Sequence, residues 1–321
     1  MYLAGDIGGT KTNLALFEKD SFQPKELQTF ASGKHPNLES IVLEYEKMVC
    51  LEKVEKACFA IAGPVQNGVC KATNLPWVVE ASKMEKAIGI NDVFLINDLE
   101  ANAHALAILP KENLIELYAG KGARVGNQAV VSPGTGLGEA GLFWDGKLHH
   151  PFASEGGHCE FGPRDEVQLD LSRYLMRRFG HASYERILSG PGLFNLYEFF
   201  RDELKRQEPK KLTPGEDPAK AITELALNKS SDLCIDTLNL FVSILGSESS
   251  NTVLKYMAIG GLFLGGGIPP KILPFLQTKS FLEGFFDKGR FRSLLEEVPI
   301  FVISDDKAAL KGSAHFCKKR K

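Results

Sequence analysis

The sequence lacks the features that mark membrane, disulfide-rich and nucleic-acid-binding proteins. It has no run of about 18 apolar residues, and no basic segment followed by an apolar one at its N-terminus. Its six cysteines include no C-x-x-C pair, which argues against a disulfide framework and against a zinc site. A formal net charge of -2 provides no overall attraction to nucleic acid or to a membrane surface. We therefore expect a cytoplasmic protein with reduced thiols.

The common nucleotide-binding motifs are missing as well. No G-x-x-x-x-G-K-[ST] occurs, and the stretch Gly9–Thr12 is too short for one and leads into a strand. The glycines Gly134, Gly136 and Gly138 precede strand-like alternation and no helix, so a dinucleotide fingerprint fails in context. The protein-kinase signature set is also missing. A nucleotide site in this chain must be built in another way.

The stretch Met1–Glu18 predicts a hairpin of two short strands joined by a glycine-rich turn. Glycines let a backbone approach a ligand closely and direct its N–H groups at an anion, so Gly8, Gly9 and Thr10 suit a phosphate. Asp6 at the entrance would repel phosphate unless a divalent cation lies between them. An ordinary hairpin with a solvated aspartate explains this stretch equally well.

The same pattern returns in Asn127–Asp145, as an apolar run, a glycine-rich turn and an alternating apolar run. Aligning Phe17 with Phe143 places Gly8 on Gly134. Internal similarity at this spacing suggests two related lobes, each with a phosphate-binding hairpin, and a nucleotide in the cleft between them. At 321 residues the chain is long enough for two cores.

The remaining elements alternate between strands and helices, which predicts an α/β fold. Residues 201–220 are rich in proline and charge and predict a surface excursion. The expected strands are 57–62, 93–96, 258–264 and 299–303. The expected helices are 38–55, 98–109, 165–179, 184–188, 230–254 and 305–316, the last capped by Asp305.

Asp98 is the acid best placed for chemistry. It follows an apolar strand directly, and Asn97 resembles the cap of the helix that comes next. Open α/β sheets place their sites at such carboxyl ends of strands. The simpler alternative is a helix-start aspartate, which is favoured by the helix dipole without any function.

Two further stretches carry candidate ligands. Ser154–Gly162 places Glu155 and His158 among glycines with little apolar content, as expected of a functional or merely flexible surface loop. Glu185 would lie in the first turn of a helix, where an acid is stabilising by itself. Carboxylates accept hydrogen bonds from adjacent hydroxyls, so these side chains could bind a polyol. Phosphoryl transfer to an alcohol needs in addition donors, a metal and a base for the hydroxyl proton, and Asp98 suits the last role.

Five motifs together resemble bacterial glucokinases, a family of the sugar kinase–actin–chaperone ATPase superfamily. The resemblance covers nearly the whole chain, and the last two motifs are the more specific. They are Asp6–Thr10, Ile96–Ala101, Pro133–Gly138, Glu155–His158 and Glu185–Gly192.

The resemblance implies a two-lobed, actin-like (ribonuclease H-like) α/β fold that closes on sugar, with a small domain of residues 1–109 plus 305–321 and a large one of 110–304. It implies ATP-dependent phosphorylation of the glucose 6-hydroxyl with Asp98 as the base, and suggests a homodimer. Glucose would be bound by Asn74, Asn97, Asp98, Glu155, His158 and Glu185. The resemblance places Mg-ATP between the two hairpins, with Mg²⁺ bound through water to Asp6 and with Gly265–Gly267 near adenosine. The residues implied to bind the nucleotide are Asp6, Gly8, Gly9, Thr10, Gly134, Thr135, Gly136, Gly265 and Gly266.

One departure concerns Thr10–Thr12, which is more like the related repressor–kinase group, whose sugar loop carries a zinc-binding cysteine cluster. This chain has Cys159 alone in that loop. The departure leaves the hexose preference open. A kinase for another hexose or amino sugar, a catalytically silent sugar sensor, and an actin-like or chaperone-like nucleotide switch are the alternatives.

Overall fold

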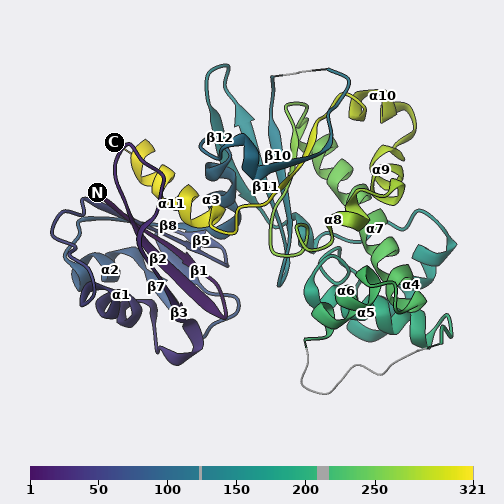
Figure 1. The fold of residues 1–321 in the computed structure, drawn as a ribbon, viewed down its shortest axis with the longest axis horizontal. Helices are drawn as coiled ribbons and strands as arrows, with labels where there is room; N and C mark the ends of the chain where they lie inside the picture. Colours follow the sequence, from purple (N-terminus) through teal and green to yellow (C-terminus); the bar gives the residue numbers. More distant parts are fainter. Residues whose placement is uncertain (123–124, 208–216, 321) are drawn as a thin grey trace. The chain divides into compact units, whose positions relative to one another are not determined.

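The computed structural model describes residues 1–122, 125–207 and 217–320, which form two compact units. The first unit comprises Met1–Asn113, Pro151–Ala153 and Asp305–Lys321, and the second comprises Leu114–His150 and Ser154–Ser304. Each unit contains a central sheet with helices packed on it, so the α/β prediction is confirmed (Figure 1). No helix in the described ranges is long and apolar enough to cross a bilayer.

The first unit is built on a five-stranded sheet of order β3-β2-β1-β4-β8. β2 is antiparallel to β1 and β3, whereas β4 is parallel to β1 and β8. A small three-stranded sheet, β5-β6-β7, accompanies it. The strands are β1 (Tyr2–Ile7), β2 (Lys11–Phe17), β3 (Lys25–Ala31), β4 (Lys56–Ile61), β5 (Val65–Gln66), β6 (Val69–Lys71), β7 (Val78–Glu80) and β8 (Asp92–Asn97).

Helices cover both faces of this sheet, because alternate strand residues point to opposite sides. Leu3 and Ile7 lie in one core with α1 (Leu38–Glu46) and α2 (Ala81–Ile88). Tyr2 and Ala4 lie in another with α3 (Asp98–Ala105) and α11 (Ala308–Lys319). In Figure 1 the C-terminal helix α11, in yellow, lies against the dark N-terminal strands.

The second unit is built on a sheet of order β12-β11-β10-β13-β14-β9, of which Pro151–Ala153 in β12 are grouped with the first unit, and the long helix α7 contributes to its core. The strands are β9 (Leu114–Tyr118), β10 (Gln128–Pro133), β11 (Leu137–Trp144), β12 (His149–Ser154), β13 (Leu262–Leu264) and β14 (Ile300–Ile303). The helices are α4 (Glu166–Phe179), α5 (Gly190–Asp202), α6 (Pro218–Leu227), α7 (Asp232–Tyr256), α8 (Leu273–Leu276), α9 (Lys279–Phe286) and α10 (Arg292–Leu295). Short 3₁₀ turns are η1 (Ser32–Lys34), η2 (Lys111–Asn113), η3 (Gly156–His158) and η4 (Gly289–Phe291).

Both predicted hairpins form, but the expected alignment between them is wrong in the return strand. Ile7 pairs with Thr12 in the first hairpin, whereas Pro133 pairs with Leu137 in the second, whose turn is one residue shorter. A one-residue shift sends a side chain to the opposite face of a sheet. Phe17 is accordingly 0% exposed, whereas Phe143 is 54% exposed.

Three expected helices differ from the structure. Residues 184–188 form a turn, and the helix begins only at Gly190, where the side chain of Ser189 caps it. The helix expected over 38–55 ends at Glu46, and the one expected over 98–109 ends at Ala105. Val49 and Ile108, apolar residues at helical spacing, lie beyond the ends of these last two helices.

Asp305 is not the cap of the last helix, which begins at Ala308 after Lys307. The Asp305 carboxylate accepts a hydrogen bond from the backbone N–H of Lys307 at 2.9 Å and pairs with Lys311 Nζ at 2.6 Å. Gly312 of this helix packs closely against the first unit's α3, since a Cβ there would lie 1.8 Å from the Ala101 carbonyl oxygen. The excursion expected over 201–220 falls partly on residues 208–216, which lie outside the described ranges.

Candidate active site

Asp98 and Asn97 lie at the junction between β8 and α3. Asn97 caps the helix, with Oδ1 accepting from the Leu99 N–H at 2.8 Å, while its Nδ2 donates to the Gly63 carbonyl at 3.1 Å. Oδ1 of Asp98 accepts from the same Leu99 N–H at 3.0 Å. The half-buried Asp98 carboxylate is therefore held at a helix N-terminus, which favours negative charge.

The turn between β1 and β2 carries the first set of predicted phosphate ligands. The Gly8 N–H donates to the Lys11 carbonyl at 2.9 Å, and the hydroxyl of Ser32 donates to the Gly8 carbonyl at 2.8 Å. A Cβ on Gly9 would lie 2.7 Å from Cβ of Asn74, so the structure places the predicted sugar ligand Asn74 against this turn. Thr10 is exposed.

Asp6 lies in the strand that leads into this turn. Burial raises the pKa of its carboxyl above the ordinary value, and a 3.4 Å hydrogen bond from Asn13 and the positive charge of Lys307 oppose that shift. In the described ranges no group of three His, Cys, Asp or Glu side chains is arranged to hold a metal ion. One carboxylate, with phosphate oxygens and water supplying the other ligands, is nevertheless how proteins commonly hold Mg²⁺. Asp6 fits that arrangement.

The second unit brings Glu155, His158 and Glu185 together. Nε2 of His158 lies 3.9 Å from the Glu155 carboxylate, and Nδ1 lies 3.9 Å from that of Glu185. Glu185 is fixed by its backbone N–H, which donates to the Gly157 carbonyl at 2.8 Å, and by the Leu137 N–H, which donates to its carboxylate at 3.0 Å. Two carboxylates and an imidazole with solvent access form a cluster suited to several neighbouring hydroxyl groups.

Glycines make this cluster possible. A Cβ on Gly157 would lie 2.1 Å from the Leu137 carbonyl oxygen, and one on Gly136 would lie 2.4 Å from a Glu185 carboxylate oxygen. Only residues without a side chain allow such approaches. The second hairpin and the loop at Glu155 are therefore packed directly on each other.

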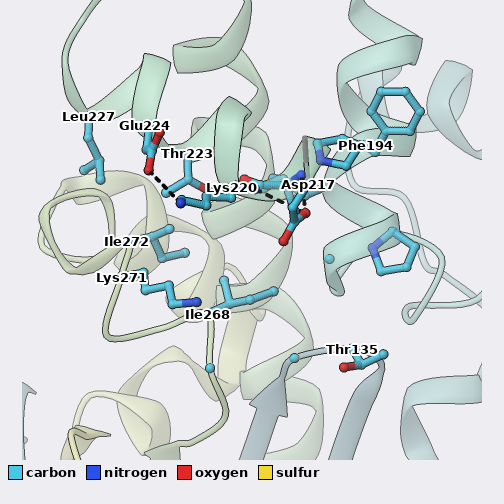
Figure 2. A pocket seen from close by; sticks show the side chains of 17 residues that line it. Thr135, Phe194, Asp217, Lys220, Thr223, Glu224, Leu227, Ile268, Lys271 and Ile272 are labelled. Atoms are coloured by element: carbon cyan, nitrogen blue, oxygen red, sulfur yellow. Dashed lines mark hydrogen bonds and ion pairs between the residues drawn. The ribbon is translucent and has the colours of Figure 1, made fainter. Parts of the chain in front are cut away.

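A pocket of about 880 Å³ opens beside the second hairpin, within the size range typical of small-molecule sites (Figure 2). Figure 2 shows Phe194 from α5, Leu227 from α6, and Ile268 and Ile272 from the segment after β13 around it, with Thr135 from the hairpin turn nearby. The polar side chains that line it are Asp217, Lys220, Thr223, Glu224 and Lys271.

The glycines after β13 have distinct roles. Gly266 has φ of +82°, and a Cβ there would lie 2.5 Å from the Pro133 carbonyl oxygen, so the turn requires glycine. Gly265 is buried against Ser132, and Gly267 lines the pocket together with Gly134. Of the predicted residues of the second hairpin and of this turn, Gly134, Thr135 and Gly267 therefore line the pocket, whereas Gly136, Gly265 and Gly266 do not.

Sequence reasoning missed the wall that α6 contributes to the pocket. That helix begins inside the stretch expected to be a surface excursion, with Asp217 accepting from the Ala219 N–H at 3.0 Å and Pro218 in the first turn. An aspartate cap, a proline at a helix start and the buried pair Ile222 and Ala226 were the available signals.

The two-sheet α/β fold, with a glycine-rich hairpin in each central sheet and a carboxylate–imidazole cluster in the second unit, defines a sugar kinase of the actin-like ATPase fold. A family model described as Glucokinase matches residues 3–320. The chain belongs to the glucokinase family, whose members are ATP-binding hexose phosphotransferases.

Individual relatives agree with this assignment. The chain is 38% identical to a glucokinase of Nostoc punctiforme over 333 residues, 98% of each chain. It is also similar to the crystal structure of a glucokinase from an Antarctic psychrotroph, with a TM-score of 0.84, 32% identity and 98% of each chain covered. A ROK family glucokinase from Streptomyces griseus, solved with glucose and AMPPNP, shares the fold at a TM-score of 0.68 and 18% identity, with 98% of each chain covered.

Proposed function

We propose that this glucokinase transfers a phosphoryl group from Mg-ATP to the 6-hydroxyl of glucose, with Asp98 as the general base. The observation that carries the proposal is the cluster in which His158 lies 3.9 Å from both Glu155 and Glu185. Such a cluster presents several acceptors to adjacent hydroxyls and has no role in an ATPase without a sugar substrate.

In this proposal glucose is bound by Asn74, Asn97 and Asp98 of the first unit and by Glu155, His158 and Glu185 of the second. Asp98 suits the role of base because Leu99 N–H anchors its Oδ1 at 3.0 Å, which orients the carboxylate on a rigid helix start. A base in this position accepts the proton as the hydroxyl attacks the phosphorus. The bond between the γ-phosphorus and the β–γ bridging oxygen of ATP breaks, so ADP leaves, the phosphoryl group passes to the sugar oxygen and the proton lies on the Asp98 carboxyl.

We propose that the adenosine of ATP binds in the pocket between α5, α6 and Gly267, whose apolar walls suit a base and whose polar groups suit a ribose. Its phosphates would be held by the backbone at Gly134, Thr135 and Gly136, near Gly265 and Gly266, and by Gly8, Gly9 and Thr10. Mg²⁺ would be bound through water to Asp6 and would neutralise the charge of the transferring group.

The test is coupled ATP turnover on glucose, mannose, fructose, N-acetylmannosamine and no sugar, with Mg²⁺ and then with excess EDTA. We expect turnover to depend on the metal and to be strongest with glucose. Stronger turnover on another sugar would correct the substrate, and absence of turnover on every sugar, with ATP still bound, would contradict phosphoryl transfer. Sedimentation of the same sample tests the homodimer that we propose for the active protein.

A further inference from the structure

A buried pair of carboxyl groups lies beneath the segment that carries Glu155 and His158. Glu139 on β11 is 1% exposed, and Glu248 on α7 is 0% exposed. They lie close enough for the negative charge of Glu248 to act on the Glu139 carboxyl group. Ionising a buried carboxyl group beside the negative charge of another has a large free-energy cost.

The donors around the pair indicate which member is neutral. Glu248 accepts hydrogen bonds from Asn251 Nδ2 at 2.8 Å and from Lys255 Nζ at 3.4 Å. Neither carboxyl oxygen of Glu139 accepts a hydrogen bond from a donor in the described ranges. A buried carboxylate needs such donors, whereas a neutral carboxyl group tolerates their absence better, so Glu139 is the neutral member. Burial and the negative charge of Glu248 raise the pKa of Glu139 to about 8, and Lys255 opposes this shift.

The Glu139 carboxyl supports the backbone of the neighbouring loop. A Cβ on Gly156 would lie 2.1 Å from Oε2 of Glu139, so the chain rests directly on this carboxyl group. The Gly156 N–H donates to Ser154 Oγ at 2.9 Å. Gly156 follows Glu155 and belongs to the turn Gly156–His158, so Glu139 forms the floor beneath two of the proposed glucose ligands.

We propose that Glu139 is a positioning residue, which, while neutral, packs against Gly156 and holds residues Ser154–His158 in the conformation that binds glucose. Loss of its proton then weakens glucose binding. This inference rests on the proposed role of Glu155 and His158 as glucose ligands.

The physical reason is the cost of an unpaired buried charge. An ionised Glu139 would lie near a second carboxylate, and contact with water would stabilise its charge at the lowest free-energy cost. Lys255 offsets the charge only in part, because it is half exposed and already paired with Glu248. Strand β11 and helix α7 belong to the core, so water reaches Glu139 by displacement of the loop. The charged and titratable groups that interact with the pair are Lys255, Tyr184, Tyr256 and Lys288, and Cys159 and Arg164 lie near these groups.

The experiment measures the glucose KM and kcat between pH 6.5 and 9.5 for the wild type and for Glu139→Gln, which is uncharged at every pH and keeps the shape and a donor. We expect the wild-type KM for glucose to rise roughly tenfold between pH 7 and pH 9. The KM of the variant should stay constant over this range and should lie within about threefold of the wild-type value at pH 7. Glu248→Gln removes the neighbouring negative charge, so the midpoint of the rise should move to lower pH.

Calorimetry supplies a second readout that a purely structural role would not move. At pH 8, glucose binding to the wild type should take up a fraction of a proton, and binding to Glu139→Gln should take up none. The exposed Glu160→Gln is the matched control and should keep the wild-type profile.

A KM profile of Glu139→Gln that parallels the wild type, or equal proton uptake in both proteins, would overturn the inference. Failure of the proposed function has a different signature. In that case Glu155→Gln and His158→Gln would bind glucose with wild-type affinity at pH 7, whatever the profile of Glu139→Gln.

Discussion

At the scale of single residues, the assigned roles depend on how each carboxyl group is held. Asp98 is half-buried at the start of a helix, where its carboxylate accepts a hydrogen bond from the Leu99 N–H and keeps access to solvent. Glu139 is enclosed among core elements and lacks a donor in the described part of the chain. The two environments therefore suit the same functional group to different proposed roles, as a base at Asp98 and as a neutral support at Glu139.

The first prediction concerns Asp98→Asn. The amide keeps an oxygen for the Leu99 N–H, so the fold and the glucose affinity should be retained, while kcat falls roughly 100-fold or more because the proton acceptor is lost. Coupled turnover and glucose calorimetry on the same preparation measure both quantities. Glu100→Gln, on the same helix, is the control and should keep its turnover. A kcat for Asp98→Asn within threefold of wild type would exclude Asp98 as the base.

The second prediction concerns the pH dependence of stability. The folded state holds the Glu139 proton up to pH of about 8, whereas the unfolded chain releases it near the ordinary value of 4.5. The folded state therefore binds more protons between these values, and its stability falls as the pH rises through that window. The Glu139→Gln variant does not lose stability in this way. The difference between its free energy of unfolding and that of the wild type should therefore rise by at least about 1 kcal/mol between pH 5 and pH 8.5. Thermal unfolding at the two pH values measures the difference, and equal wild-type and variant slopes would contradict it.

At the scale of elements, one helix contact shapes the core of the first unit and another shapes the pocket of the second. Helix α11 packs on α3 so closely that the Gly312 backbone meets the Ala101 carbonyl. Helix α6 provides one wall of the pocket next to the second hairpin. Both contacts join segments distant in sequence, and each can be tested by one substitution.

The third prediction is that Gly312→Ala destabilises the protein by about 2 kcal/mol or more, because its Cβ would lie 1.8 Å from a backbone oxygen and the helices must separate. Gly33→Ala is the matched control, since a Cβ there meets nothing within 4 Å, and it should change the stability by less than about 0.5 kcal/mol. Chemical denaturation followed by circular dichroism measures both. Equal stabilities for the two variants would show that the α3–α11 contact yields easily.

The fourth prediction concerns Ile268→Asp, which places a carboxylate on the apolar wall of the pocket. If adenosine binds there, the KM for ATP should rise about tenfold or more, equivalent to about 1.4 kcal/mol, with the glucose KM nearly unchanged. Val167→Asp, at an exposed position on α4, is the control for an added charge. Steady-state kinetics at saturating concentrations of the second substrate separate the two constants. An unchanged KM for ATP would place adenosine elsewhere.

At the scale of the whole molecule, the chain crosses from the first unit to the second and returns with its last residues. Those residues form α11, whose Leu310, Ala314 and Phe316 share a core with Tyr2 and Phe17 of the first strands. The first unit is therefore completed only when the C-terminus has been made.

The fifth prediction follows from that order. A chain that ends before Asp305 leaves one face of the first sheet uncovered, so hydrogen exchange in β1 and β4 should become fast, by at least 100-fold. Exchange in β10 and α7 should stay slow, because their core is made of residues before Asp305. Exchange resolved by peptide measures both, and slow exchange in β1 and β4 would show that α11 is dispensable.

Much of the fold and of the candidate site can be predicted from short stretches of the sequence. The two hairpins, the strand that ends at Asn97 and the cap at α3 follow from local patterns, because turns and caps are set by residues a few positions apart. The motifs at Glu155 and Glu185 pointed to a sugar kinase before any contact was known. The turn at 184–188 was missed because its apolar spacing also suits a helix, and its backbone instead bonds to Cys159 and Gly157.

The sequence by itself determined the α/β class, the glycine-rich turns and the family, since each depends on residue type within a few neighbouring positions. Only the tertiary structure decided that His158 meets Glu185, that α6 lines a pocket, and that Glu139 on β11 faces Glu248 on α7. Those outcomes depend on which elements pack together, and packing is governed by the burial of many side chains at once. A glutamate in an alternating apolar strand looks the same in the sequence whether it faces water or another buried acid.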